Sequence, residues 1–217
     1  MRLAEVTAGG RVPPHAHRQA EVTYVLSGRA RGHDGEEVEP GSCIYHAPGA
    51  RHGWEATGAE PLRYLSTFAC ERVHEPIDRT DALSTVAACI GVEDCVAWRA
   101  VEPSKGLKIR VKRLLDSGVE LMAGVCEFDT GIHYTRHYHD QPEIYYILAG
   151  SAIVYKGDSE VRLDPGSALY LASREIHGLD SIGDQPLKLF WAYGCETAGH
   201  VINWTPVEAI YEEARRR

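Results

Sequence analysis

The sequence predicts an all-β protein made of two similar barrels in tandem, and three observations support this fold class. An internal repeat divides the chain of 217 residues into two halves. Short segments rich in Val, Ile, Tyr and Leu alternate with Gly, Pro, Asp and Ser, as is typical of strands joined by turns. Helical periodicity is restricted to two short segments.

The repeat consists of two motifs in each half. Residues 9–28 and 131–150 both fit Gly-x5-His-x-His-x3-Glu-x6-Gly, and each marker of the second copy lies 122 positions after its partner. Residues 40–52 and 165–177 resemble each other at an offset of 125. The halves therefore differ by three residues between the motifs, a change that a hairpin loop absorbs easily.

The repeat places an N-terminal barrel at residues 1–78, a linker at 79–95, and a C-terminal barrel with a terminal helix at 96–217. The second copy has additional strand-like sequence before its first motif, in Cys95–Ala100 and Leu107–Leu114.

Both helical segments carry a start or stop signal. Asp81–Ile90 has apolar residues at helical spacing and is followed by Gly91, which predicts a short linker helix. Thr205 and Glu208 form a capping-box pattern around Pro206, which predicts a C-terminal helix.

Composition excludes several classes of partner. Hydrophobic residues make up 44% of the chain, and the net charge of -8 argues against nucleic acids and anionic membranes, which bind basic surfaces. No apolar run approaches the roughly 20 residues of a membrane span, and no signal segment is evident, so a cytoplasmic location is expected. A sheet edge left by the shorter first copy is compatible with a homodimer.

The six cysteines form no Cys-x-x-Cys pair, and we expect them to be buried as small hydrophobic side chains.

The repeated histidines and glutamates have the spacing of metal ligands. Alternate residues of a strand share a face, so the two histidines of each His-x-His point the same way, and the glutamate follows at an even separation. A curled sheet can bring the later histidine over the same interior. The predicted ligands are His15, His17, Glu21 and His52 in the first half, and His137, His139, Glu143 and His177 in the second.

Three imidazoles and one carboxylate suit a divalent transition metal. The set fits Fe(II), Mn(II), Ni(II), Zn(II) or Cu(II), one ion per barrel, and a six-coordinate ion keeps two positions open for substrate or water. Open positions are typical of a catalytic rather than a structural metal site.

Both motif pairs resemble the two motifs of the cupin superfamily, and the tandem arrangement resembles a bicupin, which implies two double-stranded β-helix (jelly-roll) barrels that bind metal. The second motif of the family usually contains Pro-x-Gly before the metal histidine. The first copy keeps Pro48 and Gly49 with the proline shifted by one, whereas the second copy has Ala172 and Arg174.

The resemblance leaves three functions open. The favoured hypothesis is a metal-dependent dioxygenase acting on a small organic acid or related metabolite, with Fe(II) as metal and the C-terminal site as reactive centre. The second is a redox-neutral lyase, decarboxylase or isomerase, and the third is a non-catalytic small-molecule binding protein. A sequence without a DNA-binding segment but with two full ligand sets disfavours the third.

Tyr145 is the candidate catalytic residue of the second hypothesis. It shares a face with Glu143, and a phenol near a divalent cation loses its proton more easily and can act as a base. Glu-x-Tyr here, with the later PLKLFW run, is similar to cupin lyases that cleave dimethylsulfoniopropionate.

Strand parity indicates further residues near the ligands. It places Thr23, Val25 and Trp54 in the N-terminal pocket, and Ile147 and Leu179 in the C-terminal one. His133 shares parity with His137, and Arg136 and Arg174 flank C-terminal ligands where they could bind a carboxylate or face solvent. The remaining histidines, His46 among them, are expected to be structural or exposed.

Overall fold

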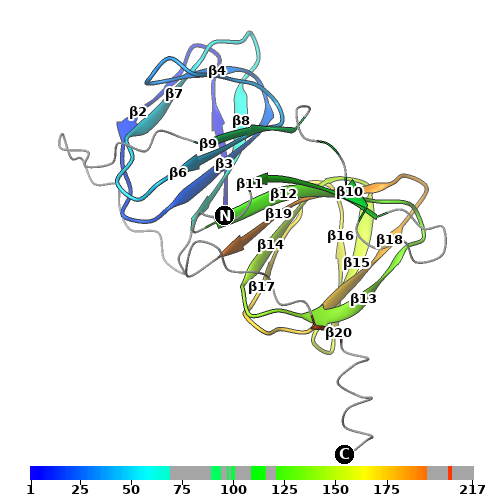
Figure 1. Cartoon of the computed structure of the whole chain (residues 1–217). Coiled ribbons are helices and arrows are strands. Elements are labelled where there is room, and N and C mark those ends of the chain that lie inside the picture. The colour runs from blue at the N-terminus through cyan, green and yellow to red at the C-terminus, as the bar shows by residue number, and fades with distance from the viewer. Residues whose placement is uncertain are drawn as a thin grey trace, which may run out of the picture. The chain divides into compact units, whose positions relative to one another are not determined.

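The computed structural model describes residues 1–68, 89–93, 97, 99–100, 109–115, 121–194 and 205–206. The chain divides into two compact units, Met1–Val96 with Leu114–Leu121, and Ala97–Arg113 with Met122–Arg217. In the described part of each unit the structure is built from strands (Figure 1), which confirms the predicted all-β fold of two barrels.

The N-terminal unit contains two sheets, with strand orders β1-β8-β3-β6-β9 and β2-β7-β4-β5. All pairings between neighbouring strands are antiparallel. The strands are β1 (Arg2–Val6), β2 (Arg11–His15), β3 (Glu21–Ser27), β4 (Ala30–Gly32), β5 (Glu37–Val38), β6 (Ser42–His46), β7 (His52–Ala56), β8 (Leu62–Phe68) and β9 (Cys89–Val92).

The C-terminal unit repeats this plan, with strand orders β10-β11-β12-β19-β14-β17 and β16-β15-β18-β13-β20. Its strands are β10 (Arg99–Ala100), β11 (Ile109–Leu115), β12 (Leu121–Phe128), β13 (His133–Tyr138), β14 (Glu143–Ala149), β15 (Ser151–Lys156), β16 (Ser159–Leu163), β17 (Ala168–Leu171), β18 (His177–Ile182), β19 (Leu187–Gly194) and β20 (Thr205–Pro206). The extra strand-like sequence of the second copy thus contributes β10 and β11.

Each unit encloses its own core between its two sheets, as expected of a sheet curled on itself. Val25, Ile44 and Leu62 form part of the N-terminal core. Ile147 and Leu179 belong to the C-terminal core. These side chains leave only 0–1% of their surface exposed, because alternate residues of each strand point inward.

The final glycine of the first motif is explained by the turn after β3 and β14. Gly28 and Gly150 have positive φ angles of 79° and 67°. A Cβ atom on them would lie 2.4 and 2.5 Å from the carbonyl oxygens of Pro61 and Pro186, respectively. Only glycine allows this approach between the hairpin and the neighbouring strand.

The two predicted helices fall mostly on residues outside the described ranges. At the end of the first, Cys89 and Ile90 lie in β9, opposite Tyr45 and Ile44 of β6, so the helix prediction is wrong for these two residues. Backbone pairing with an existing sheet edge outweighs a short helical pattern, which is a weak signal by itself. Thr205 and Pro206, predicted to begin the second helix, pair with β13. Of the cysteines whose side chains are described, Cys43 is buried, as expected, and Cys126 is partly buried.

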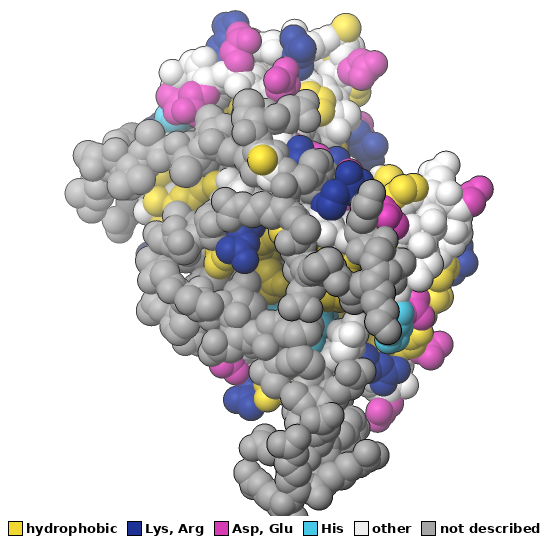
Figure 2. Space-filling view, turned by 45° about the vertical axis from the view of Figure 1, so that its right-hand side comes forward, with side chains coloured by type: hydrophobic (Ala, Val, Ile, Leu, Met, Phe, Trp, Pro, Cys, Tyr) yellow, Lys and Arg dark blue, Asp and Glu magenta, His cyan; other side chains and the backbone are white. Residues whose placement is uncertain are grey.

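The surface carries charges of both signs. Acidic and basic side chains are interspersed on the face shown in Figure 2. Several form exposed ion pairs, such as Arg11–Glu55 at 2.8 Å and Arg31–Glu37 at 3.1 Å, each of which contributes little to stability. Among the described residues no helix has the length and hydrophobicity of a membrane span.

We expect Gly150→Ala to destabilise the C-terminal unit by about 3 kcal/mol, because the new Cβ meets the Pro186 carbonyl and the positive φ angle is strained for alanine. Gly157→Ala is the matched control, since its φ angle is also positive (56°) but no atom lies within 4 Å of the added Cβ. The control should lose only about 1 kcal/mol. Urea midpoints compare the two variants, and equal losses would contradict the close-approach explanation.

Candidate metal centres

The N-terminal ligand set is brought together by three strands. His15 ends β2, Glu21 begins β3, and His52 begins β7, with His15 directly opposite His52 in the ladder. One nitrogen from each of His15, His17 and His52 lies within 4.8 Å of the other two. Glu21 Oε2 is 3.2 Å from His17 Nε2 and 3.0 Å from His52 Nε2.

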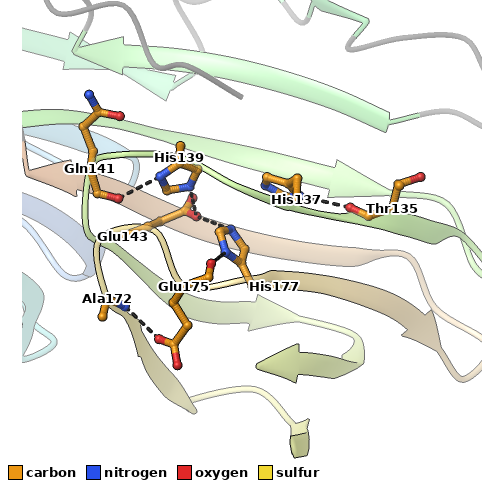
Figure 3. Close-up of polar contacts among 8 residues, drawn as sticks. All are labelled: Thr135, His137, His139, Gln141, Glu143, Ala172, Glu175 and His177. Atoms are coloured by element: carbon orange, nitrogen blue, oxygen red, sulfur yellow. Dashed lines mark hydrogen bonds and ion pairs between the residues drawn. The ribbon is translucent and has the colours of Figure 1, made fainter. Parts of the chain in front are cut away.

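The C-terminal set has the same arrangement. His137 lies in β13 opposite His177, the first residue of β18, and Glu143 begins β14. Nitrogens of His137, His139 and His177 lie within 4.8 Å of one another. Glu143 Oε2 is 3.3 Å from Nε2 of both His139 and His177 (Figure 3). All eight predicted ligands therefore lie in two clusters, one inside each unit.

Backbone carbonyl groups orient most of the imidazoles. When Nδ1–H donates to a carbonyl oxygen, Nε2 is left free to face the cluster. Figure 3 shows this for His137, His139 and His177, whose partners belong to Thr135, Gln141 and Glu175. The five such contacts, 2.7–3.0 Å long, are His15–Pro13, His52–Ala50, His137–Thr135, His139–Gln141 and His177–Glu175.

The buried carboxylates remain ionised because imidazoles surround them. Burial alone would raise the pKa of Glu143, but its contacts with His139 and His177 outweigh this and lower the pKa to about 2. The pKa of Glu21 is likewise held well below its ordinary value by His17 and His52, against the effect of burial. Burial and the charge of His177 lower the pKa of His137 to about 4, which keeps this imidazole neutral and able to act as a ligand.

The clusters fit a divalent metal. Donor atoms about 3 Å apart are what adjacent ligands with bonds of about 2.1 Å require around one ion. His177 Nε2 is buried, and its one printed contact is the 3.3 Å ion pair with Glu143, so it is free to bind an ion held between the two side chains. The nitrogen and oxygen donors are those preferred by borderline transition metals.

The departure of the second copy from Pro-x-Gly leaves the turn unchanged. Arg174 occupies the place of Gly49, with a φ angle of 60° compared with 78°. Arg174 N donates to His139 O at 2.8 Å, just as Gly49 N donates to His17 O at 2.7 Å. This bond ties the turn to a ligand in both units and holds a non-glycine residue in a left-handed conformation at a cost of about 1 kcal/mol.

Tyr145 lies in the C-terminal core beside Glu143, with its ring 6.4 Å from that of His177. Burial raises its pKa well above 10, and the carboxylate of Glu143 raises it further. Tyr193, which the sequence analysis did not select, has the same relation to Glu143 and its pKa is raised in the same way. Both phenols therefore suit hydrogen-bond donors to the carboxylate better than proton acceptors.

Two further residues near the N-terminal ligands were missed from the sequence. The Ser66 hydroxyl donates to Glu21 Oε1. His46 stacks on His52 with ring centroids 4.1 Å apart, and burial together with the charge of His52 lowers its pKa to about 3. The signal for His46 was its β-ladder position opposite Glu21, which only a strand-pairing prediction could have supplied.

The side chains of three other candidates lie at the surface. His133 is exposed beside Asp180, as expected for the histidines outside the ligand positions, and a bulge between Tyr134 and His137 breaks the alternation by which it shared parity with His137. Arg136 lies over the ring of Tyr155, and Arg174 lies 3.5 Å from Asp140.

Comparison with known proteins agrees with this architecture. The family model for the cupin domain matches residues 2–68 and 124–193, one match in each unit. A search of curated proteins gave no match.

Three solved structures share the fold. The Lactobacillus farciminis oxalate decarboxylase in its formate complex has a TM-score of 0.69 and 14% sequence identity, and the match covers 97% of this chain and 81% of that one. AerE from Microcystis aeruginosa has a TM-score of 0.69 and 16% sequence identity, and the match covers 89% of this chain and 86% of that one. The Bacillus subtilis oxalate decarboxylase with Mn(II) centres has a TM-score of 0.67 and 16% sequence identity, and the match covers 93% of this chain and 70% of that one.

We expect the protein to bind about two equivalents of divalent metal and the variants His52→Ala and His177→Ala to bind about one each, because each loses one of four donors in a separate cluster. Elemental analysis of protein purified without a metal-binding tag measures this. The exposed His33 provides the control, since His33→Ala should retain both equivalents. Loss of both metals in either cluster variant would contradict two independent sites.

Proposed function

Because the chain belongs to the cupin family and has two tandem cupin barrels, we propose that it is a metal-dependent enzyme acting on a small organic acid by redox-neutral cleavage, as a lyase or decarboxylase. The observation that carries the proposal is the pair of buried clusters, each with three imidazoles and a carboxylate around one point. A set of four protein donors leaves open positions for a chelating substrate.

The residues of each cluster have two roles, metal binding and orientation of the ligands. The histidines and Glu21 or Glu143 would hold the ion, and backbone carbonyls would fix the imidazole tautomers. A bound divalent cation would act as a Lewis acid toward a carboxylate or hydroxyl oxygen. All of these residues except His15 are buried, and a low-dielectric interior strengthens the electrostatic interactions among them.

The redox-neutral reaction is supported by two oxalate decarboxylases among the solved structures with this fold, one of them with Mn(II) centres. Fold similarity at 14–16% identity does not carry an activity by itself. The dioxygenase with Fe(II), favoured from the sequence, uses the same ligand set and is therefore the alternative against which the proposal is tested.

The two reactions differ in their need for oxygen. We expect the Mn(II)-loaded protein to convert a member of a panel of small 2-hydroxy, 2-oxo and dicarboxylic acids equally well in air and under anaerobic conditions, because redox-neutral cleavage consumes no oxidant. Product formation is followed by NMR, and oxygen uptake by an electrode. Turnover that stops without O2, with stoichiometric oxygen uptake, would instead support the dioxygenase.

Tyr145→Phe tests the role of the phenol in the C-terminal core. Because burial and Glu143 raise the pKa of Tyr145, we expect the rate of Tyr145→Phe to change by less than about tenfold and its metal content to stay the same. Loss of a general base would cost about 10²–10⁴ in rate. A loss of that size with both metals retained would restore Tyr145 as the base of a C-terminal reactive centre. Tyr134→Phe, at a partly buried tyrosine of the same core, is the control.

A further inference from the structure

The two barrels can be compared position by position, because their ladders have the same register. Glu21 pairs with His46 on β6 and Phe68 on β8. Glu143 pairs with Leu171 on β17 and Tyr193 on β19. The side chain beside the metal-ligating glutamate is therefore an imidazole in the N-terminal barrel and an aliphatic group in the C-terminal barrel.

The next pair of inward positions along these strands is also more polar in the N-terminal barrel. Thr23 pairs with Ser66 in the N-terminal barrel. The equivalent pair in the C-terminal barrel is Tyr145 and Trp191, both of which belong to the hydrophobic core. Small hydroxyl side chains thus stand where the C-terminal barrel has two large aromatic rings.

Two of the N-terminal lining atoms are buried without a partner. His46 is 5% exposed and Thr23 is 1% exposed, and neither His46 Nε2 nor Thr23 Oγ1 makes a hydrogen bond. The His46 ring is held in place by stacking on His52 and by an edge contact with Trp54, at 5.7 Å between centroids. A buried polar atom without a partner is costly, so such atoms usually bind an ordered water or a ligand.

The corresponding C-terminal positions offer less to a polar ligand. Leu171 is fully buried and has no polar atom, and the Tyr145 hydroxyl is directed at Glu143. Of these positions only Trp191 has a buried atom without a partner, its Nε1, which can donate a hydrogen bond but not accept one. The ligands also differ in access, because His15 is partly exposed whereas its counterpart His137 is 2% exposed. The positions beside the C-terminal cluster therefore carry large packed side chains, whereas the equivalent N-terminal positions carry small hydroxyls and an imidazole with an unpartnered nitrogen.

We propose that the N-terminal barrel is the substrate site, and that His46 Nε2 and Thr23 Oγ1 bind an oxygen of a small chelating acid beside the metal ligands. The C-terminal cluster then holds its metal within a packed core and supports the fold. The inference rests on the proposed function, from which it takes the metal-chelating acid, and it adds the location of the substrate and the residues that bind it.

The chemistry of the two free atoms defines the ligand. An imidazole nitrogen and a hydroxyl both form hydrogen bonds with carboxylate or hydroxyl oxygens. The ligand must place one oxygen pair on the metal and another oxygen beside β3 and β6, whose paired residues lie about 5 Å apart. Phe68 is the ladder partner of Glu21, and Trp54 contacts His46, so two bulky aromatic side chains lie near these atoms and favour a compact ligand. Dicarboxylates and 2-hydroxy acids of two to four carbons meet these requirements.

Cobalt spectroscopy on the full chain can separate the two sites. In His177→Ala, Co(II) is loaded in the N-terminal cluster alone, and in His52→Ala in the C-terminal cluster alone. Oxalate and glycolate serve as probes, and the visible spectrum of Co(II) reports their binding without any need for turnover. We expect both variants to bind cobalt but only His177→Ala to show a saturable spectral change with a probe. Equal changes in the two variants, a change in His52→Ala alone, or none in either would overturn the inference.

Variants of the lining residues test the subsite itself. In the His177→Ala background, His46→Leu copies the residue found at Leu171, and we expect it to weaken probe binding about tenfold or more while cobalt stays bound. His46→Gln should recover part of the affinity, because an amide restores a hydrogen-bonding group. Thr23→Val should weaken binding several-fold.

Thr67→Val is the matched control, because Thr67 is also buried with an unpartnered hydroxyl but pairs with Val22, on the other face of β3 and β8. It should bind the probe as the parent does. Unchanged affinity in both His46→Leu and Thr23→Val would show that these atoms hold only water, and would overturn the inference. Probe binding at the N-terminal site without anaerobic turnover of any acid in the panel would overturn the proposed function and leave this inference standing.

Discussion

The rest of the structure depends on keeping a carboxylate ionised inside each barrel. Glu21 and Glu143 are 4% and 2% exposed, and an isolated buried charge of this kind costs several kcal/mol. Two imidazoles contact each carboxylate, and backbone carbonyls fix the direction of most of the rings. The strands must therefore hold four side chains from distant positions within a few ångströms, which requires a closed and well-packed barrel.

The two barrels share this frame and differ in what surrounds it. The backbone register around Glu21 is repeated around Glu143, so the ligand geometry is duplicated. The inward positions beside the ligands can nevertheless change without breaking a ladder, because the ladder uses only backbone groups. Thr23 and Ser66 occupy the positions that Tyr145 and Trp191 occupy in the second copy, so this layer has small hydroxyls in one barrel and aromatic rings in the other. Duplication of a fold thus allows one barrel to bind substrate while the other stabilises the folded protein.

The turn that carries the last histidine shows how tertiary contacts override local preference. Arginine disfavours a positive φ angle, yet Arg174 adopts one because its N–H binds the carbonyl of His139, a ligand residue. Gly49 makes the equivalent bond to His17 without strain. The position of the turn is determined by the ligand strand it contacts, and the ordinary glycine only lowers the cost of reaching it. The family motif can therefore lose its glycine and keep its ligand.

The sequence by itself determined the repeat, the all-β class and the eight residues of the two clusters, because strand periodicity and motif spacing are properties of consecutive residues. Only the tertiary structure determined which residues of neighbouring strands lie opposite each other. His46 and Ser66 reach Glu21 through pairing of β3 with β6 and β8, a register that no local pattern encodes. The bulge in β13 turned His133 away from the cluster for the same reason, since an extra residue in one strand is visible only against its partner. Burial beside Glu143 likewise raises the pKa of Tyr145, an effect that the residue type alone does not give.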